Sequence, residues 1–125
     1  MIMIIKYITW HLSVIFMLLS FLYSRDVISD VDFQIIERED IIMVISYTLI
    51  PENSKSSYTI DLMISSDGGV SWFSPKSING DIKNISNRGK KTIHWDIFSD
   101  IEELEGDIKV KVIGKLKESL FKKIF

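Results

Sequence analysis

A histidine and a neighbouring carboxylate are the first candidates for chemistry in this chain. His94 is the only histidine after the first 24 residues, and Asp96 follows it by two positions, on the same face of an extended strand. With a serine, these side chains have the types that nucleophilic catalysis uses. Nothing around them marks a nucleophile elbow, and Trp95 points to the opposite face. We therefore expect a half-exposed strand histidine and no enzyme active site.

Carboxylates form a second candidate group, because Ca²⁺ takes about six to eight oxygen ligands in proteins. An acidic run near the C-terminal part of the chain comprises Asp100, Glu102, Glu103, Glu105 and Asp107. It lacks the Asp-x-Asp-x-Asp-Gly order of an EF-hand, so we expect a solvated acidic loop and no metal or other cofactor. A separate set of aspartates could converge at one end of a folded domain: Asp61, Asp67, Asp81 and Asp96.

Aromatic side chains are a third candidate group, for binding rather than catalysis. Trp72, Phe73 and Trp95 could form an exposed platform for a carbohydrate or a protein. Core packing is the competing interpretation for the two tryptophans, because a small domain without disulfides needs large buried aromatics. If Trp72 points inward, strand alternation sends Phe73 outward. Phe73 and Trp95 are therefore the candidate binding-surface residues.

The segment 65–72, Ser-Ser-Asp-Gly-Gly-Val-Ser-Trp, predicts a tight β-hairpin. Asp67 is short enough to accept hydrogen bonds from N–H groups of the turn, and Gly68 and Gly69 tolerate positive φ angles. Trp72 offers a large apolar face for packing. We therefore give Ser65, Asp67, Gly69 and Trp72 a structural role in this hairpin.

Short alternating segments dominate the rest of the chain and predict strands near 31–36, 41–49, 58–65, 70–73, 77–78, 91–95 and 108–112. The segment 41–49 is almost continuously apolar, as in a central strand that is covered on both faces. Helical patterns do not separate these segments, so we expect an all-β fold. The expected architecture is an antiparallel immunoglobulin-like β-sandwich of about seven strands, spanning 25–113.

The first 24 residues differ in composition from the rest. Lys6 is their only charge, and the apolar run 7–23 follows it and is closed by Ser24. A membrane span needs about 20 apolar residues, so this pattern predicts a hydrophobic helix that acts as an export signal cleaved near Ser24. The alternative is an uncleaved N-terminal membrane anchor, since Leu22 stands where signal peptidases prefer a small residue. The expected location is periplasmic, cell-surface or secreted.

The segment 114–125 breaks the strand pattern with four lysines and one acid. Its apolar residues have helical spacing: Leu116, Leu120, Phe121 and Ile124. This basic amphipathic tail predicts either a helix that docks on a membrane surface or a partner, or a short helix or frayed tail on its own domain.

The octet at 65–72 resembles the Asp-box, Ser-x-Asp-x-Gly-x-Thr/Ser-Trp, of bacterial neuraminidase repeats. A single copy implies a hairpin device without sialidase activity. More broadly, 58–112 resembles immunoglobulin-like or fibronectin type III-like modules of exported bacterial proteins. Besides the octet, the matching elements are Ser-Ile-Asn-Gly-Asp at 77–81, Gly-Lys-Lys-Thr-Ile-His-Trp-Asp at 89–96 and Lys-Val-Lys-Val at 109–112. The resemblance implies an accessory or adhesive part of the cell envelope.

Charge and cysteine content narrow the function further. Without Lys6 the chain has 14 basic and 17 acidic residues. This net negative charge argues against nucleic-acid binding. The chain has no cysteine, so packing alone must stabilise it. We expect a non-enzymatic exported module with a protein-binding, structural or accessory role at the cell envelope. Membrane contact would involve 1–24 or the basic tail. The alternative is a carbohydrate-binding module that uses exposed aromatics.

Overall fold

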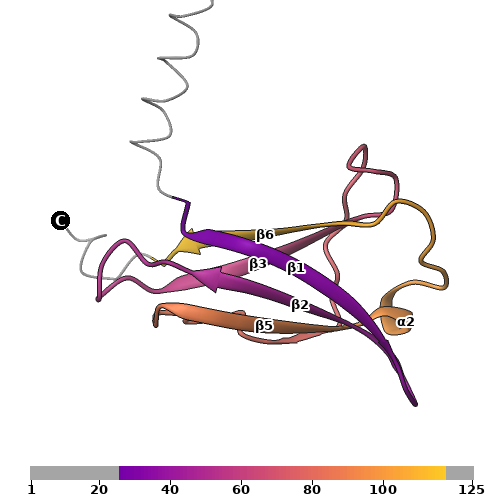
Figure 1. The fold of residues 1–125 in the computed structure, drawn as a ribbon, viewed down its shortest axis with the longest axis horizontal. Helices are drawn as coiled ribbons and strands as arrows, with labels where there is room; N and C mark the ends of the chain where they lie inside the picture. Colours follow the sequence, from indigo (N-terminus) through magenta and orange to yellow (C-terminus); the bar gives the residue numbers. More distant parts are fainter. Residues whose placement is uncertain (1–25, 118–125) are drawn as a thin grey trace, which may run out of the picture.

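Two antiparallel sheets enclose one core in the computed structural model, which describes residues 26–117 (Figure 1). The wider sheet has the order β1-β2-β5-β4, and the narrower one pairs β3 with β6. The strands are β1 (Ile28–Glu37), β2 (Ile41–Leu49), β3 (Tyr58–Ser65), β4 (Ile78–Gly80), β5 (Gly89–Asp96) and β6 (Lys109–Leu116). A single helical turn, α2 (Ile97–Asp100), follows β5. The all-β prediction is confirmed.

The described residues cover the expected domain except for Arg25 and end within the expected tail. The predicted hydrophobic helix at 1–24 and the residues 118–125 of the predicted tail lie outside the described residues. Strand β6 continues through Leu116, so 114–116 pair with β3 and extend the sheet past the expected boundary at 113. No helix within 26–117 has the length and apolar character needed to cross a membrane.

Strand β2 shows how alternation creates the core. Its residues Met43, Ile45, Tyr47 and Leu49 are completely buried, whereas the residues between them are partly exposed. The strand is central, between β1 and β5, but it is covered on one face only, so the expectation of cover on both faces is wrong. Its outer face, with Ile42, Val44, Ser46 and Thr48, is only partly buried, because no second layer lies over it within the described part of the chain.

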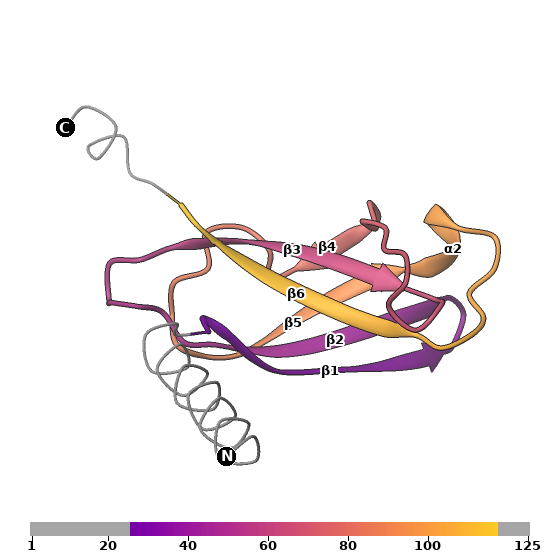
Figure 2. The ribbon, with the colours of Figure 1, turned by 90° about the horizontal axis from the view of Figure 1, so that it is seen from above.

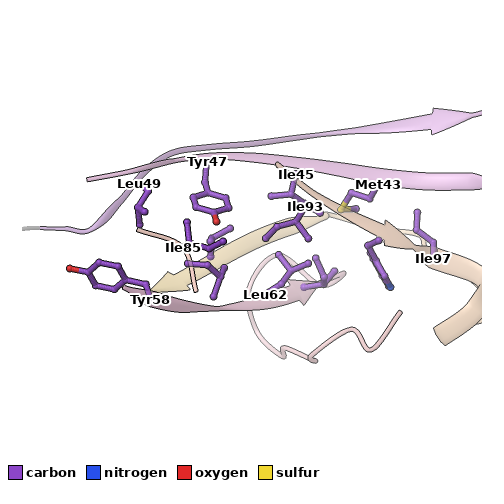
Figure 3. Close-up of a cluster of buried hydrophobic side chains, with 13 residues drawn as sticks. Met43, Ile45, Tyr47, Leu49, Tyr58, Leu62, Ile85, Ile93 and Ile97 are labelled. Atoms are coloured by element: carbon purple, nitrogen blue, oxygen red, sulfur yellow. The ribbon is translucent and has the colours of Figure 1, made fainter. Parts of the chain in front are cut away.

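Strand β3 supplies the opposite wall of the core through Tyr58, Ile60, Leu62 and Ile64. Figure 3 shows side chains of the two sheets meeting between the layers, with Ile93 from β5 close to Ile45 from β2. Because β3 and β6 make a sheet of only two strands, loops must complete this wall. The free edge of β3 binds backbone groups of Phe73, Ile82 and Ile85 with N···O distances of 2.7–3.0 Å.

The predicted strand 70–73 is reduced to one bridged residue. Phe73 exchanges two backbone hydrogen bonds with Ile64, both 2.9 Å long, while 70–72 belong to the preceding turn. The described chain therefore has six strands instead of about seven.

The polar groups near the start of β5 are hydrogen-bonded to one another. The Tyr47 hydroxyl donates to the carbonyl oxygen of Asp81 at 2.6 Å, and the Asp81 carboxylate accepts the N–H of Thr92 at 2.9 Å. Burial, and then the charge of Asp81, raise the pKa of Tyr47 above its ordinary value, so the phenol stays neutral. The turn there has Gly80 at φ 109°, where a side chain would meet the Thr92 carbonyl.

Two adjacent residues of β2 test the difference between its buried face and its partly exposed face. We expect Ile45→Ala to lower the free energy of unfolding by about 3 kcal/mol, because it opens a cavity in the core. Val44→Ala, on the partly exposed face, should cost about 1 kcal/mol or less. Urea denaturation of both variants measures the difference, and equal losses would show that the two faces of β2 are not distinct.

Candidate functional site

Asp67 holds the turn after β3 through both oxygens of its carboxylate. Oδ1 accepts the Ser65 hydroxyl at 2.7 Å and the N–H groups of Val70 and Ser71 at 3.1 and 2.9 Å. Oδ2 accepts the Ser71 hydroxyl, and Ser65 Oγ accepts the N–H of Gly69 at 2.9 Å. These bonds, first those from Ser71, hold the pKa of Asp67 well below its usual range. The turn is thus built around an ionised carboxylate.

Trp72 and Phe73 lie opposite to the expected arrangement, in which Trp72 points inward and Phe73 outward. Phe73 packs on the core, with its ring centre 5.8 Å from that of Trp95. Trp72 lies half-buried at the surface, where its indole N–H donates to the Gly69 carbonyl at 3.1 Å and the Lys111 ammonium sits 4.5 Å from its ring centre. Strand alternation does not apply, because Trp72 belongs to the turn.

Trp95 is completely buried, so the prediction that it belongs to a binding surface is wrong. Its indole N–H donates to the Asp100 carboxylate at 2.9 Å. The same carboxylate accepts the N–H groups of Lys76 and Ser77 at 2.7 and 2.9 Å and the Ser77 hydroxyl at 2.6 Å. The bonds from Ser77 and then from Trp95 and Lys76 hold the pKa of Asp100 well below its usual range. Asp100 therefore joins α2, β5 and the segment before β4.

The other aspartates considered as a set do not converge. Each has a separate partner: Asp61 pairs with the Lys115 ammonium at 2.6 Å, Asp81 accepts from Thr92, and Asp96 accepts the Ser99 hydroxyl at 2.7 Å. Glu102, Glu103 and Glu105 are exposed. Across 26–117 no cluster of three or more His, Cys, Asp or Glu side chains has the arrangement of a metal site.

His94 is exposed on the outer face of the wide sheet, opposite Val44 of β2. The serine bonded to Asp96 is Ser99, on the following helical turn. Within the described residues the hydrogen bonds thus do not connect His94, Asp96 and a serine into a catalytic triad.

A candidate binding surface, which the sequence did not assign to a particular strand, lies along β1, an end strand of the wide sheet. The N–H of Phe33 donates to the side chain of Asp32 at 2.8 Å, outside the ladder with β2. Residues of an antiparallel strand alternately direct their backbone groups toward and away from the partner strand. Phe33 and Ile35 therefore direct their N–H and C=O groups to the open side of the sheet.

Apolar side chains accompany this open edge on both faces. Ile35 is 43% exposed on the inner face, beyond the cover of the narrow sheet. On the outer face, Ile36, Ile42 and Val44 line an open groove of about 820 Å³, whose rim includes the charged turn 38–40 and His94. Figure 1 shows this turn between β1 and β2 standing apart from the narrow sheet. The consecutive Ile35 and Ile36, which break the alternation, were the sequence signal for apolar residues on both faces.

No protein-family model, curated protein or solved structure matches this chain. The carboxylates of Asp67 and Asp100 accept the most hydrogen bonds, and their donors lie within the domain itself. Among the described residues, the β1 edge and its groove form an open surface with exposed apolar side chains.

Replacing Asp100 tests its structural role. We expect Asp100→Ala to lower the melting temperature by about 4–8 °C, because it leaves the Trp95 indole and two loop N–H groups without their acceptor. Glu103→Ala, in the same acidic run but exposed, should change it by about 1 °C or less. Thermal denaturation followed by circular dichroism measures both. Equal effects would contradict the assigned role of Asp100.

The lowered pKa values of Asp67 and Asp100 predict a loss of stability in acid. A carboxylate with a depressed folded-state pKa stabilises the fold above its unfolded pKa of about 3.9, and this stabilisation disappears as the pH falls below that value. The melting temperature should therefore fall between about pH 4 and pH 2. The double variant Asp67→Asn, Asp100→Asn should melt lower at neutral pH and show a flatter acid dependence. A slope equal to that of the unaltered protein would exclude these two groups as its cause.

Proposed function

We propose that this chain is a non-enzymatic exported module, with an immunoglobulin-like arrangement of its two sheets, that binds another protein at the cell envelope. The partner contributes an extended segment that pairs with the open edge of β1. The observation that carries this proposal is the outward direction of the backbone groups of Phe33 and Ile35 beside the exposed apolar side chain of Ile35.

Strand addition uses both properties of such an edge. Backbone hydrogen bonds supply affinity, and alternate side chains of the added strand contact the two faces of the sheet. Here one set of side chains would cover Ile35, and the other would enter the groove beside Ile36 and Ile42. Both apolar surfaces would lose contact with water, which favours association.

The N-terminal half of β1 is unsuited to such pairing, which confines the site. The register with β2 shifts between Ser29 and Asp32, and Asp30 has a φ of 51°. Bulges of this kind protect sheet edges against pairing. The regular part of the edge runs from Asp32 to Glu37, long enough for a short partner segment.

Other features support the envelope setting and argue for this function over the alternative. Lys6 followed by the apolar run 7–23 has the pattern of an export segment. Trp95 is buried, and Lys111 covers one face of Trp72, so the aromatic platform of a carbohydrate-binding module finds no support.

A proline at position 35 tests the proposal. Because the Ile35 N–H points outward, Ile35→Pro removes a donor needed by the partner without removing a bond to β2. A photo-crosslinking amino acid at Gln34 should capture one envelope protein in living cells. Ile35→Pro should reduce the yield of this crosslinked complex about tenfold or more. This is the effect expected for the loss of one or two backbone hydrogen bonds and the packing around them.

Matched variants keep this test decisive. Ile35→Lys should also reduce the yield, whereas Ile113→Lys, at a similarly exposed isoleucine of β6, should not. The melting temperature of each variant is also measured, so that a variant that fails to fold is recognised. A crosslinked partner that is retained with both changes at position 35, or none at all with the unaltered edge, would refute strand addition at β1.

A further inference from the structure

The two ends of the described chain leave the domain side by side. Val27 accepts a hydrogen bond from the Ile50 N–H at 2.8 Å, and a side chain built on Gly114 would lie 3.6 Å from Val27. Figures 1 and 2 show the start of β1 and the end of β6 at the same end of the two sheets. The apolar run 7–23 is thus joined to the domain beside the end of β6.

This end of the domain is basic. Its loops and strand ends are brought together by backbone bonds such as Lys117 N–H to Ser57 and Tyr58 N–H to Ile85. They place the following cations around the chain ends: Lys55, Lys83, Arg88, Lys90, Lys115 and Lys117. The acids in the same region are Asp26, Asp30, Glu52, Asp61 and Asp81, of which Asp61 is paired with Lys115 and Asp81 accepts the N–H of Thr92.

The opposite end is strongly acidic. The turn after β1, the Asp67 turn and the segment from the end of β5 to β6 lie there, and they contain Glu37, Glu39, Asp40, Asp67, Asp96, Asp100, Glu102, Glu103, Glu105 and Asp107. The basic residues among them are Arg38, Lys76 and Lys109. The overall negative charge of the chain therefore conceals a domain that is polarised along the length of its strands.

We infer that residues 1–24 are retained as a membrane anchor and that this basic end lies against the anionic headgroups of the same membrane. Each basic group held near an anionic lipid surface strengthens binding about fivefold, and the attraction fades within about one Debye length. The cations come from separate loops and strand ends at the end of the domain where β1 begins, and the apolar run precedes β1 in the sequence.

Lysine footprinting on the full chain tests this inference. The protein is reconstituted into vesicles of phosphatidylcholine alone, or of phosphatidylcholine with phosphatidylglycerol, and acetylated with a membrane-impermeant reagent before peptide mass spectrometry. We expect Lys83 and Lys117 to react about fivefold more slowly on the anionic vesicles, and high salt to abolish the difference. Lys76 and Lys109, at the acidic end, should react equally on both.

Charge reversals supply the controls. Lys83→Glu with Arg88→Glu should remove the protection of Lys117, whereas Lys76→Glu with Lys109→Glu, which changes the net charge equally, should preserve it. Melting temperatures confirm that each variant is folded. Equal reaction of Lys117 on both kinds of vesicle would overturn the inference, as would protection by inorganic phosphate without anionic lipid. A mass showing that the membrane-derived chain begins at or near Arg25 would also overturn it.

Discussion

The unequal width of the two sheets is the constraint from which the other features of this domain follow. A sheet of two strands cannot cover the inner face of a sheet with four. It buries the centre of that face, where Met43, Ile45 and Ile93 are inaccessible to solvent, and it leaves Ile35 of β1 substantially exposed. The remaining inner surface must be covered by loops or stay open. Loops cover the side toward β4, whereas Ile35 of β1 stays 43% exposed within 26–117, so an open apolar edge is a direct consequence of the architecture.

Loops that serve as core walls need fixed backbones, and this chain has no cysteine to fix them. Ionised carboxylates take this role. Asp67 binds the turn that brings Phe73 onto the core, and Asp100 binds the segment that leads into β4 while accepting the indole N–H of Trp95. Because a buried N–H without an acceptor is costly, the complete burial of Trp95 depends on Asp100. Asp67 and Asp100 are therefore structural, and the proposed binding surface consists of backbone groups and apolar side chains.

The part of this structure that the sequence predicts is the part determined by local periodicity. Alternation located β2, β3, β5 and β6, and the bonds around Asp67 follow from residues at most four positions apart. The role of Asp100 could not be predicted in this way, because its partner Lys76 is 24 positions distant. Alternation also misplaced Trp72 and Phe73, since it holds only inside a strand. The open edge of β1 depends on strand order, which is set by long-range pairing.

The charge distribution relates the open edge to the basic end. Strand β1 starts beside the basic chain ends and finishes in the acidic turn at Glu37, so its regular half lies toward the acidic end. An anionic membrane would repel that end as it attracts Lys83 and Lys117, and both forces turn the domain in the same direction. In the proposed orientation the edge from Asp32 to Glu37 is held away from the lipid, where a partner segment can reach it. The acids at Glu37, Glu39 and Asp40 would favour a partner whose added strand carries basic residues at the end next to this turn, because like charges there would oppose pairing.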